Sequence, residues 1–147
     1  MMPDKGAVIW NEFLSYLGHK DGIKKVLTVK ENLLQLLALG QASCLLETHA
    51  EILHKLNLTA LMDKPCQQLS AGQQRKVALA SIIMNQKKLW ILDEPLSSLD
   101  KNSVCILQTF FDNHLNEGGM IIMVSHLPLA DKTQNHLIDL SAQELPC

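Results

Sequence analysis

Short apolar runs alternate along this chain with longer segments whose apolar residues recur at helical spacing. The runs are rich in strand-forming residues, and they predict strands at 7–10, 13–17, 89–92, 120–124 and 136–140. The runs at 89–92 and 120–124 contain no charged residue, which is typical of strands buried on both faces of a parallel sheet. We therefore expect both of these strands to lie inside a parallel sheet.

Helical periodicity fills most of the segments between these runs. Thr28 and Glu31 have the spacing of a capping box for a helix at 29–39, which Gly40 would end. Ser70 is a suitable N-cap for a helix at 73–84. Further helical segments are predicted at 43–56, 58–62, 101–115 and 127–132. This alternation of strands and helices predicts one α/β domain with a helical insertion.

Composition narrows the class of protein. The chain has 147 residues, of which 47% are hydrophobic, so it is long and apolar enough to form one folded domain. The net charge is −2 without a basic block, which argues against nucleic-acid binding. No apolar run approaches the roughly 20 residues of a membrane helix, and residues 1–5 lack the apolar core of a signal peptide. We therefore expect a cytosolic protein.

The cysteines and histidines do not form a metal-binding pattern. The four cysteines are widely separated without a Cys-x-x-Cys pair, which argues against a zinc ribbon or a thioredoxin-type site; they are Cys44, Cys66, Cys105 and Cys147. The six histidines are also dispersed. Reduced, structurally incidental thiols are the expected outcome.

Two carboxylates follow the predicted strand at 89–92. Asp93 and Glu94 end that run, and Pro95 stops the strand because it has no N–H to donate. Ligands of open α/β sheets bind beyond the carboxyl ends of the strands, so both acids are expected at a ligand-binding edge. One carboxylate there can hold Mg²⁺, and its neighbour can orient and deprotonate a water molecule. Taken alone, the same pair would simply solvate the end of a strand.

Two further polar features have the same ambiguity. Ser70 begins a helix whose free N–H groups could bind an anion, and Gly72 would let a ligand approach the backbone closely. Equally, these residues could form an ordinary helix cap. His126 follows the predicted strand at 120–124, where a histidine is often only a polar strand end. Its expected position at the same edge as Asp93 favours a functional role.

Taken in order, these pieces resemble the C-terminal half of an ATP-binding cassette (ABC) ATPase, an α/β fold of the P-loop NTPase type with a helical subdomain. The resemblance rests on Leu-Ser-Ala-Gly-Gln at 69–73, Leu-Trp-Ile-Leu-Asp-Glu-Pro at 89–95, Ser-Ser-Leu-Asp at 97–100, and Ser-His at 125–126. It implies ATP and Mg²⁺ as ligands and a second ABC ATPase subunit as a dimer partner.

The resemblance also implies a role for individual residues. Asp93 would hold Mg²⁺, Glu94 would polarise the attacking water, and His126 would bond the terminal phosphate. Ser70, Gly72 and Gln73 would contact ATP held by the other subunit. Asp100 would lie at the dimer seam, in the loop that couples the two sites.

One part of the family pattern is absent from the sequence. The segment at 3–11 resembles the turn and strand that follow the first helix of an ABC ATPase, yet no Gly-x-x-x-x-Gly-Lys-Ser/Thr string occurs anywhere in the chain. Without that loop, no backbone nest or lysine is available to hold phosphates. We therefore expect an N-terminally truncated domain, divided into a strand and Q-loop region (1–26), a helical subdomain with the signature (27–85) and the remaining core (86–147).

A subfamily is indicated by the loop near His19. Most ABC ATPases have a Gln there, whereas this chain reads Leu-Gly-His-Lys-Asp-Gly-Ile at 17–23 and Leu-Thr-Val-Lys-Glu-Asn-Leu at 27–33. These strings resemble the ATPases of haem exporters for cytochrome c biogenesis. The resemblance implies that His19 lies near the nucleotide. The resemblance implies an integral-membrane permease partner and a peripheral location on the cytoplasmic face of the inner membrane. Two alternatives remain: a non-catalytic fragment acting through its interaction surfaces, and the ATPase of another ABC transporter.

Overall fold

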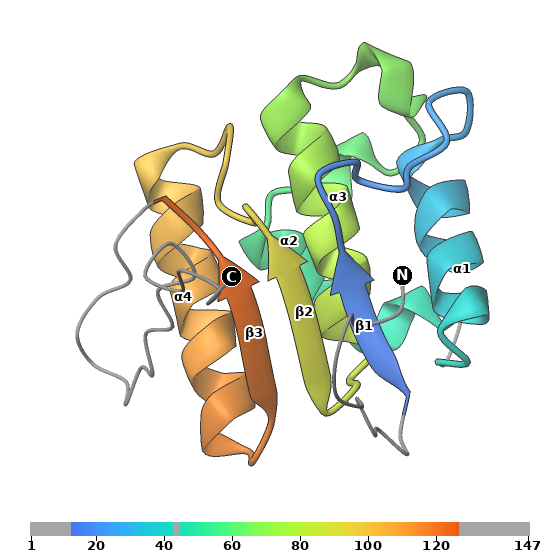
Figure 1. Ribbon diagram of the computed structural model, residues 1–147. Helices are drawn as coiled ribbons and strands as arrows, with labels where there is room; N and C mark the ends of the chain where they lie inside the picture. The colour runs from blue at the N-terminus through green and yellow to red at the C-terminus, as the bar shows by residue number, and fades with distance from the viewer. Residues whose placement is uncertain (1–12, 43–44, 127–147) are drawn as a thin grey trace, which may run out of the picture.

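Three parallel strands form one sheet in the computed structural model, which describes residues 13–42 and 45–126 (Figure 1). The strands are β1 (Leu14–Leu17), β2 (Leu89–Asp93) and β3 (Met120–Val124), in the order β1-β2-β3. They confirm the strands predicted at 13–17, 89–92 and 120–124, while the segments at 7–10 and 136–140 lie outside the described residues. Because the strands are parallel, their carboxyl ends share one edge, here called the carboxyl edge.

The helices lie behind the sheet in Figure 1. They are α1 (Val29–Leu39), α2 (Ala50–Lys55), α3 (Ala71–Met84) and α4 (Lys101–Asn116), with 3₁₀ turns at Leu46–His49, Thr59–Leu61 and Cys66–Gln68. The predicted capping box of α1 is confirmed, because the Thr28 hydroxyl accepts from the Glu31 N–H and the Glu31 carboxylate accepts from the Thr28 N–H. Helix α3 begins two residues before the predicted start, directly after Ser70.

The helix predicted at 43–56 is wrong in extent. The described part of this segment forms a 3₁₀ turn and then the short helix α2. The Thr48 hydroxyl donates to the Leu45 carbonyl at 2.7 Å, a local bond that competes with regular helix formation. The segment predicted at 58–62 is a 3₁₀ turn, and the one at 127–132 lies outside the described residues.

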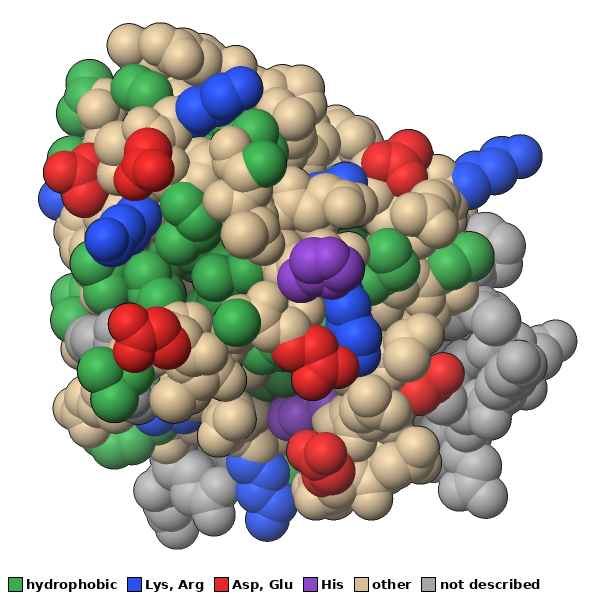
Figure 2. Space-filling model, turned by 180° about the vertical axis from the view of Figure 1, so that it is seen from behind, with side chains coloured by type: hydrophobic (Ala, Val, Ile, Leu, Met, Phe, Trp, Pro, Cys, Tyr) green, Lys and Arg blue, Asp and Glu red, His purple; other side chains and the backbone are tan. Residues whose placement is uncertain are grey.

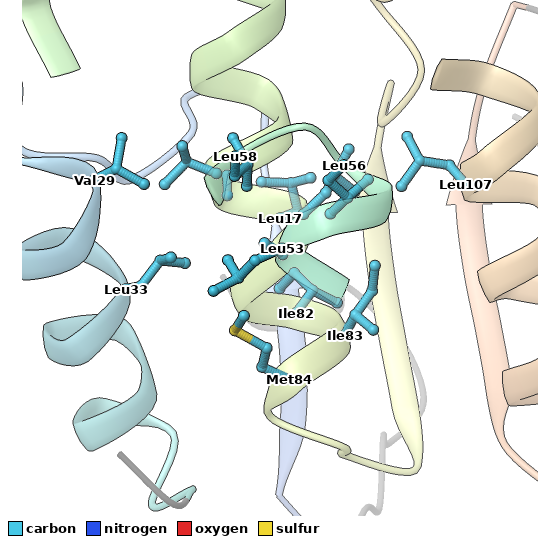
Figure 3. Packing of buried hydrophobic residues seen from close by; sticks show 14 of the residues in the cluster. Leu17, Val29, Leu33, Leu53, Leu56, Leu58, Ile82, Ile83, Met84 and Leu107 are labelled. Carbon is cyan, nitrogen blue, oxygen red and sulfur yellow. The ribbon is translucent and has the colours of Figure 1, made fainter. Parts of the chain in front are cut away.

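The hydrophobic core lies between the helices and one face of the sheet. Val29 and Leu33 of α1 point toward Leu53 and Leu58, and Ile82 of α3 lies beneath them (Figure 3). Helix α3 is buried continuously from Val77 to Met84, so it is the central element of the core. Helix α4, predicted at 101–115, adds the buried Leu107 and Phe111 to this core, and Val104, Ile106 and Phe110 are partly buried against it.

The opposite face of the sheet carries exposed apolar side chains. The register aligns Tyr16, Ile91 and Ile122 across the three strands, so they share this face. Tyr16 is 64% exposed and Ile122 is 59% exposed. The expectation that 120–124 is buried on both faces is therefore wrong, because no described helix covers this side of β3.

The surface behind the sheet carries Lys and Arg interspersed with Asp and Glu (Figure 2). None of the helices in the described ranges is long and apolar enough to cross a membrane.

Candidate functional site

Glu94 and His126 meet at the carboxyl edge. β2 ends at Asp93, and Glu94 turns away from the strand with a left-handed backbone (φ 47°). Its N–H donates to the Val124 carbonyl at 2.8 Å, which ties this turn to the end of β3. As a result, Glu94 Oε1 lies 3.4 Å from His126 Nε2, and the His126 N–H donates to Glu94 Oε2 at 3.4 Å. The structure thus brings together two residues separated by a whole helix and strand.

The Glu94 carboxylate has an oxygen without a hydrogen bond. Oε1 is buried and has no hydrogen-bonded partner in the described chain, because the approach of His126 Nε2 has an ion-pair distance without hydrogen-bond geometry. The interaction becomes an ion pair only when the imidazole is protonated. The His126 side chain is 94% exposed, so its ring is accessible to a ligand. A buried acceptor without a donor is energetically costly, and such a group can accept a proton or hydrogen bond from water.

The backbone and the side chain of Asp93 differ in their hydrogen bonding. Its carbonyl accepts from Arg75 Nη2 at 2.5 Å, whereas its carboxylate forms no hydrogen bond within residues 13–42 and 45–126. No group of three or more His, Cys, Asp or Glu side chains suited to a metal occurs in those residues. Mg²⁺ is usually held by only one or two carboxylates together with phosphate and water, so this carboxylate fits such an ion.

The first turn of α3 lies at the same end of the molecule as the carboxyl edge (Figure 1). Ser70 and Gln73 form a capping box: the Gln73 N–H donates to Ser70 Oγ at 3.2 Å, and the Ser70 N–H donates to Gln73 Oε1 at 3.0 Å. Ser70 is exposed and Gln73 is half-buried, so the Ser70 side chain is accessible to another molecule. Gly72 is needed for a close approach, but the atom that approaches it here is the Ser98 carbonyl oxygen of the same chain.

Asp100 is the N-cap of α4. Its carboxylate accepts from the Ser103 N–H at 2.8 Å and from the Ser103 hydroxyl at 2.7 Å, and Lys76 Nζ lies 3.5 Å away. The Ser103 bonds are the main reason that the pKa of Asp100 is lowered to about 2, with a smaller contribution from Lys76. Asp100 therefore links α4 to α3 by way of Lys76.

His19 is exposed on the loop that follows β1. The structure does not bring it into contact with Glu94 or His126, and its side chain forms no hydrogen bond in the part of the chain that is described. The neighbouring acid Asp21 behaves differently, since it forms an ion pair with Arg75 at 2.6 Å. Of the cysteines in the described ranges, Cys66 is buried and Cys105 is exposed, and both are free thiols.

Arg75 is the residue that sequence analysis missed. It belongs to α3, is only 4% exposed, and contacts the segments that follow both β1 and β2. The available signal was a pair of cations directly before the apolar part of α3, because a cation that is buried at such a position needs partners.

A pocket of about 560 Å³ lies away from these residues, at the amino end of β2. Lys88, Trp90, Phe110 and His114 are among the side chains that line it, and none of the predicted site residues does. The candidate site is therefore the carboxyl edge, where Glu94 and His126 meet, and not this pocket.

Several known proteins have sequences similar to that of this chain. The family model described as ABC transporter matches residues 2–97. The "Cytochrome c biogenesis ATP-binding export protein CcmA" of Vibrio cholerae is 44% identical over 117 residues, covering 80% of this chain and 56% of the relative. Proteins of the same name from Histophilus somni and Nitrosomonas europaea are 38% and 36% identical, and each alignment covers 93% of this chain and 69% or 71% of the relative. The chain thus spans little more than half the length of the Vibrio relative.

Solved structures support the fold. One described as "Structure of ATP binding subunit of ABC transporter" superposes with a TM-score of 0.67 at 20% identity, covering 78% of this chain and 49% of the other. One described as "RNase-L Inhibitor" has a TM-score of 0.67 at 24% identity, covering 84% of this chain and 24% of the other.

Proposed function

We propose that this chain, which belongs to the ABC transporter family of ATP-binding proteins, is part of the ATP-binding subunit of an exporter for cytochrome c biogenesis. It would supply the carboxyl edge with the catalytic residues and the first turn of α3, here called the signature turn. The observation that carries the proposal is the convergence of Glu94 and His126 at the carboxyl edge, with the unpartnered Glu94 Oε1 between β2 and β3. Binding of nucleotide and Mg²⁺ is general in this family.

In this proposal, Glu94 acts as the general base. Its unpartnered carboxylate oxygen accepts a hydrogen bond from the attacking water and takes its proton as the bond to the terminal phosphorus forms. The bond between that phosphorus and the bridging oxygen breaks, and ADP leaves with the electron pair. The exposed His126 imidazole donates to a terminal phosphate oxygen and orients the water between itself and Glu94. The Asp93 carboxylate would hold Mg²⁺, which neutralises phosphate charge when it is bound.

The signature turn acts on a second nucleotide. The exposed Ser70 hydroxyl and the first N–H groups of α3 offer donors to a phosphate held by a partner subunit, with the helix dipole favouring negative charge. Asp100 fixes the start of α4 beside this turn. His19 would contribute from the loop after β1. Haem export, the permease partner and a peripheral location on the cytoplasmic face of the inner membrane are parts of the same proposal, supported by the names of the relatives.

A second candidate function is a non-catalytic half-site. The 147 residues contain no Gly-x-x-x-x-Gly-Lys-Ser/Thr string to hold the phosphates that Glu94 and His126 would act upon. Such a chain would serve only the nucleotide of a P-loop-bearing partner, through Ser70, Gly72 and Gln73. Transport of another substrate is the remaining alternative within the family.

Calorimetry with Mg²⁺-ATP separates the two candidates. The Glu94→Gln variant suppresses turnover and is titrated to millimolar nucleotide. Saturable binding supports a nucleotide site on this chain, and loss of that binding in Asp93→Asn would support the proposed Mg²⁺ ligand. Absence of binding to the chain alone supports the half-site.

A mixed assembly tests the half-site directly. An intact ABC ATPase subunit, with its signature serine replaced by alanine, is combined with this chain, and phosphate release is measured. Restored hydrolysis that is lost in Ser70→Ala supports the half-site. Thr28→Ala is the matched control, because it removes the equivalent capping box of α1 without changing the carboxyl edge. Loss of hydrolysis in both variants would reduce the role of Ser70 to helix capping.

A further inference from the structure

Arg75 lies where the segments following β1 and β2 meet. Its guanidinium is almost fully buried and contacts both segments. On the β1 side, Nη1 donates to the Gly18 carbonyl at 3.1 Å and to Asp21 Oδ1 at 2.6 Å. Because β1 and β2 are adjacent parallel strands, one side chain of α3 reaches both of their carboxyl ends.

On the β2 side, three successive carbonyl groups converge on the same guanidinium. Nη2 donates to the carbonyls of Asp93 at 2.5 Å and Glu94 at 2.8 Å, and Nε donates to that of Pro95 at 3.4 Å. Arginine has five N–H donors in a rigid fork and no acceptor, a geometry suited to holding several oxygens at once. A lysine or glutamine at this position would leave some of these buried carbonyls without a donor.

These contacts explain how Glu94 keeps its unusual backbone. Its left-handed φ of 47° is unfavourable for a residue with a side chain, and such a conformation persists only when its surroundings fix it. The Glu94 N–H donates to the Val124 carbonyl, and the Glu94 carbonyl accepts from Arg75 at 2.8 Å and from the Ser97 N–H at 3.1 Å, so both sides of the residue are restrained. The direction of the Glu94 carboxylate toward His126 follows from this backbone conformation.

We propose that Arg75 is a positioning residue, which sets the Glu94 carboxylate and couples it to the position of the loop that carries Gly18 and Asp21. The inference rests on the proposed catalytic role of Glu94 for its functional meaning, but its geometric content does not depend on nucleotide. A displacement of the loop after β1 would move the guanidinium through Asp21 and thereby release or restore the turn at Glu94.

NMR spectroscopy of the nucleotide-free chain tests this coupling. In Arg75→Gln, we expect Glu94 to lose the Cα shift and three-bond coupling of a positive φ, and its amide exchange to accelerate about tenfold or more. Arg75→Lys should recover part of this loss, because an ammonium can reach some of the carbonyls. Asp21→Asn keeps the guanidinium and should also move the Glu94 signals, which a purely local support by Arg75 would not produce.

Two controls separate positioning from loss of stability. Leu79→Ala removes a buried side chain from the same helix and should lower the melting temperature without changing the Glu94 signals. Lys76→Gln changes the neighbouring cation, which faces Asp100 and not the three carbonyls. Unchanged Glu94 signals in folded Arg75→Gln would overturn the proposal; if that variant does not fold, unchanged signals in Asp21→Asn would do so.

The same variants distinguish this inference from the proposed function. Titration of Mg²⁺-ATP into Glu94→Gln reports on nucleotide binding, whereas the Glu94 backbone signals report on Arg75 without any nucleotide. Displaced Glu94 signals in a chain that binds no ATP would support the positioning role and count against a nucleotide site on this chain alone.

Discussion

The carbonyl oxygen of Ser98 lies against Gly72, where an added Cβ atom would come within 2.5 Å of it. The close contact joins the first turn of α3 to the segment that leads into α4. Ser98 itself has a left-handed backbone (φ 63°), and its carbonyl oxygen is the nearest atom to the position of that Cβ. The signature turn and the loop before Asp100 are therefore one structural unit within a single chain.

Gly72→Ala tests this unit. The obstructing atom is a backbone oxygen that cannot swing aside, so we expect the free energy of unfolding to fall by about 1–3 kcal/mol in urea denaturation. Gly18→Ala is the matched control, because its Cβ would meet the end of the exposed and movable Tyr16 ring. Equal losses in the two variants would contradict the importance of the Ser98 contact.

The cap at Asp100 predicts a pH dependence. Its folded pKa of about 2 lies below the ordinary value of 3.8, so the stabilisation is fully present above the ordinary value and is lost as the pH falls toward 2. The stability difference between the unmodified chain and Asp100→Asn should therefore shrink over this range. Carboxyl NMR titration measures the pKa directly.

Variants of the two partners show which one lowers the pKa. Ser103→Ala should raise the pKa of Asp100 more than Lys76→Gln does, because the Ser103 hydrogen bonds are the larger cause. A larger effect from Lys76→Gln would show that charge, and not the helix cap, dominates.

The Trp90 indole stacks on His114, with ring centroids 3.8 Å apart and planes within 9°. This contact, together with the approach of His114 Nε2 to the Lys88 carbonyl at 3.2 Å, fixes the end of α4 against the start of β2. We expect His114→Ala to lower the free energy of unfolding by about 1 kcal/mol. Asn113→Ala, at the exposed neighbouring position, should have little effect; a similar loss there would indicate that helix propensity is being measured.

Ile121 and Ile122 point to opposite faces of β3 and give a paired test of the exposed sheet face. Ile122→Thr keeps a β-branched side chain and should change the free energy of unfolding by less than about 0.5 kcal/mol while reducing self-association in sedimentation velocity. Ile121→Thr places a hydroxyl against the core and should cost about 1–3 kcal/mol. Self-association that persists unchanged in Ile122→Thr would show that another surface causes it.

Local signals in the sequence predicted much of this structure. The capping box of Thr28 and Glu31 and the N-cap at Ser70 depend on residues close in the sequence, so both were predicted without tertiary information. The sequence analysis did not include Gln73 in a capping box with Ser70. The apolar run at 120–124 correctly predicted a strand but wrongly predicted burial on both faces. A run of apolar residues does not show which elements cover each face of the sheet. The 3₁₀ turn at Leu46–His49 contains the Thr48 hydroxyl bond, a local contact that apolar periodicity does not detect.

The candidate site was predictable only in outline. Parallel strands bring Glu94 and His126 to one edge, and this follows from topology alone. The left-handed backbone of Glu94 depends on carbonyl contacts with Arg75, and the latter's ion pair with Asp21 spans 54 positions in the sequence. No local sequence pattern encodes such contacts. The role of Arg75 could therefore be recognised only in the three-dimensional structure, where α3 packs against the sheet.

The pairing of β1 with β2 has a consequence for synthesis on the ribosome. The whole segment from α1 to α3 lies between these two strands in the sequence. The nascent chain therefore presents β1, with its unpaired peptide groups, well before β2 is translated. Ladder formation across so long a loop is also slow compared with helix formation. Chaperone binding to the emerging chain should therefore be strongest during this interval and should decline once β2 has left the exit tunnel.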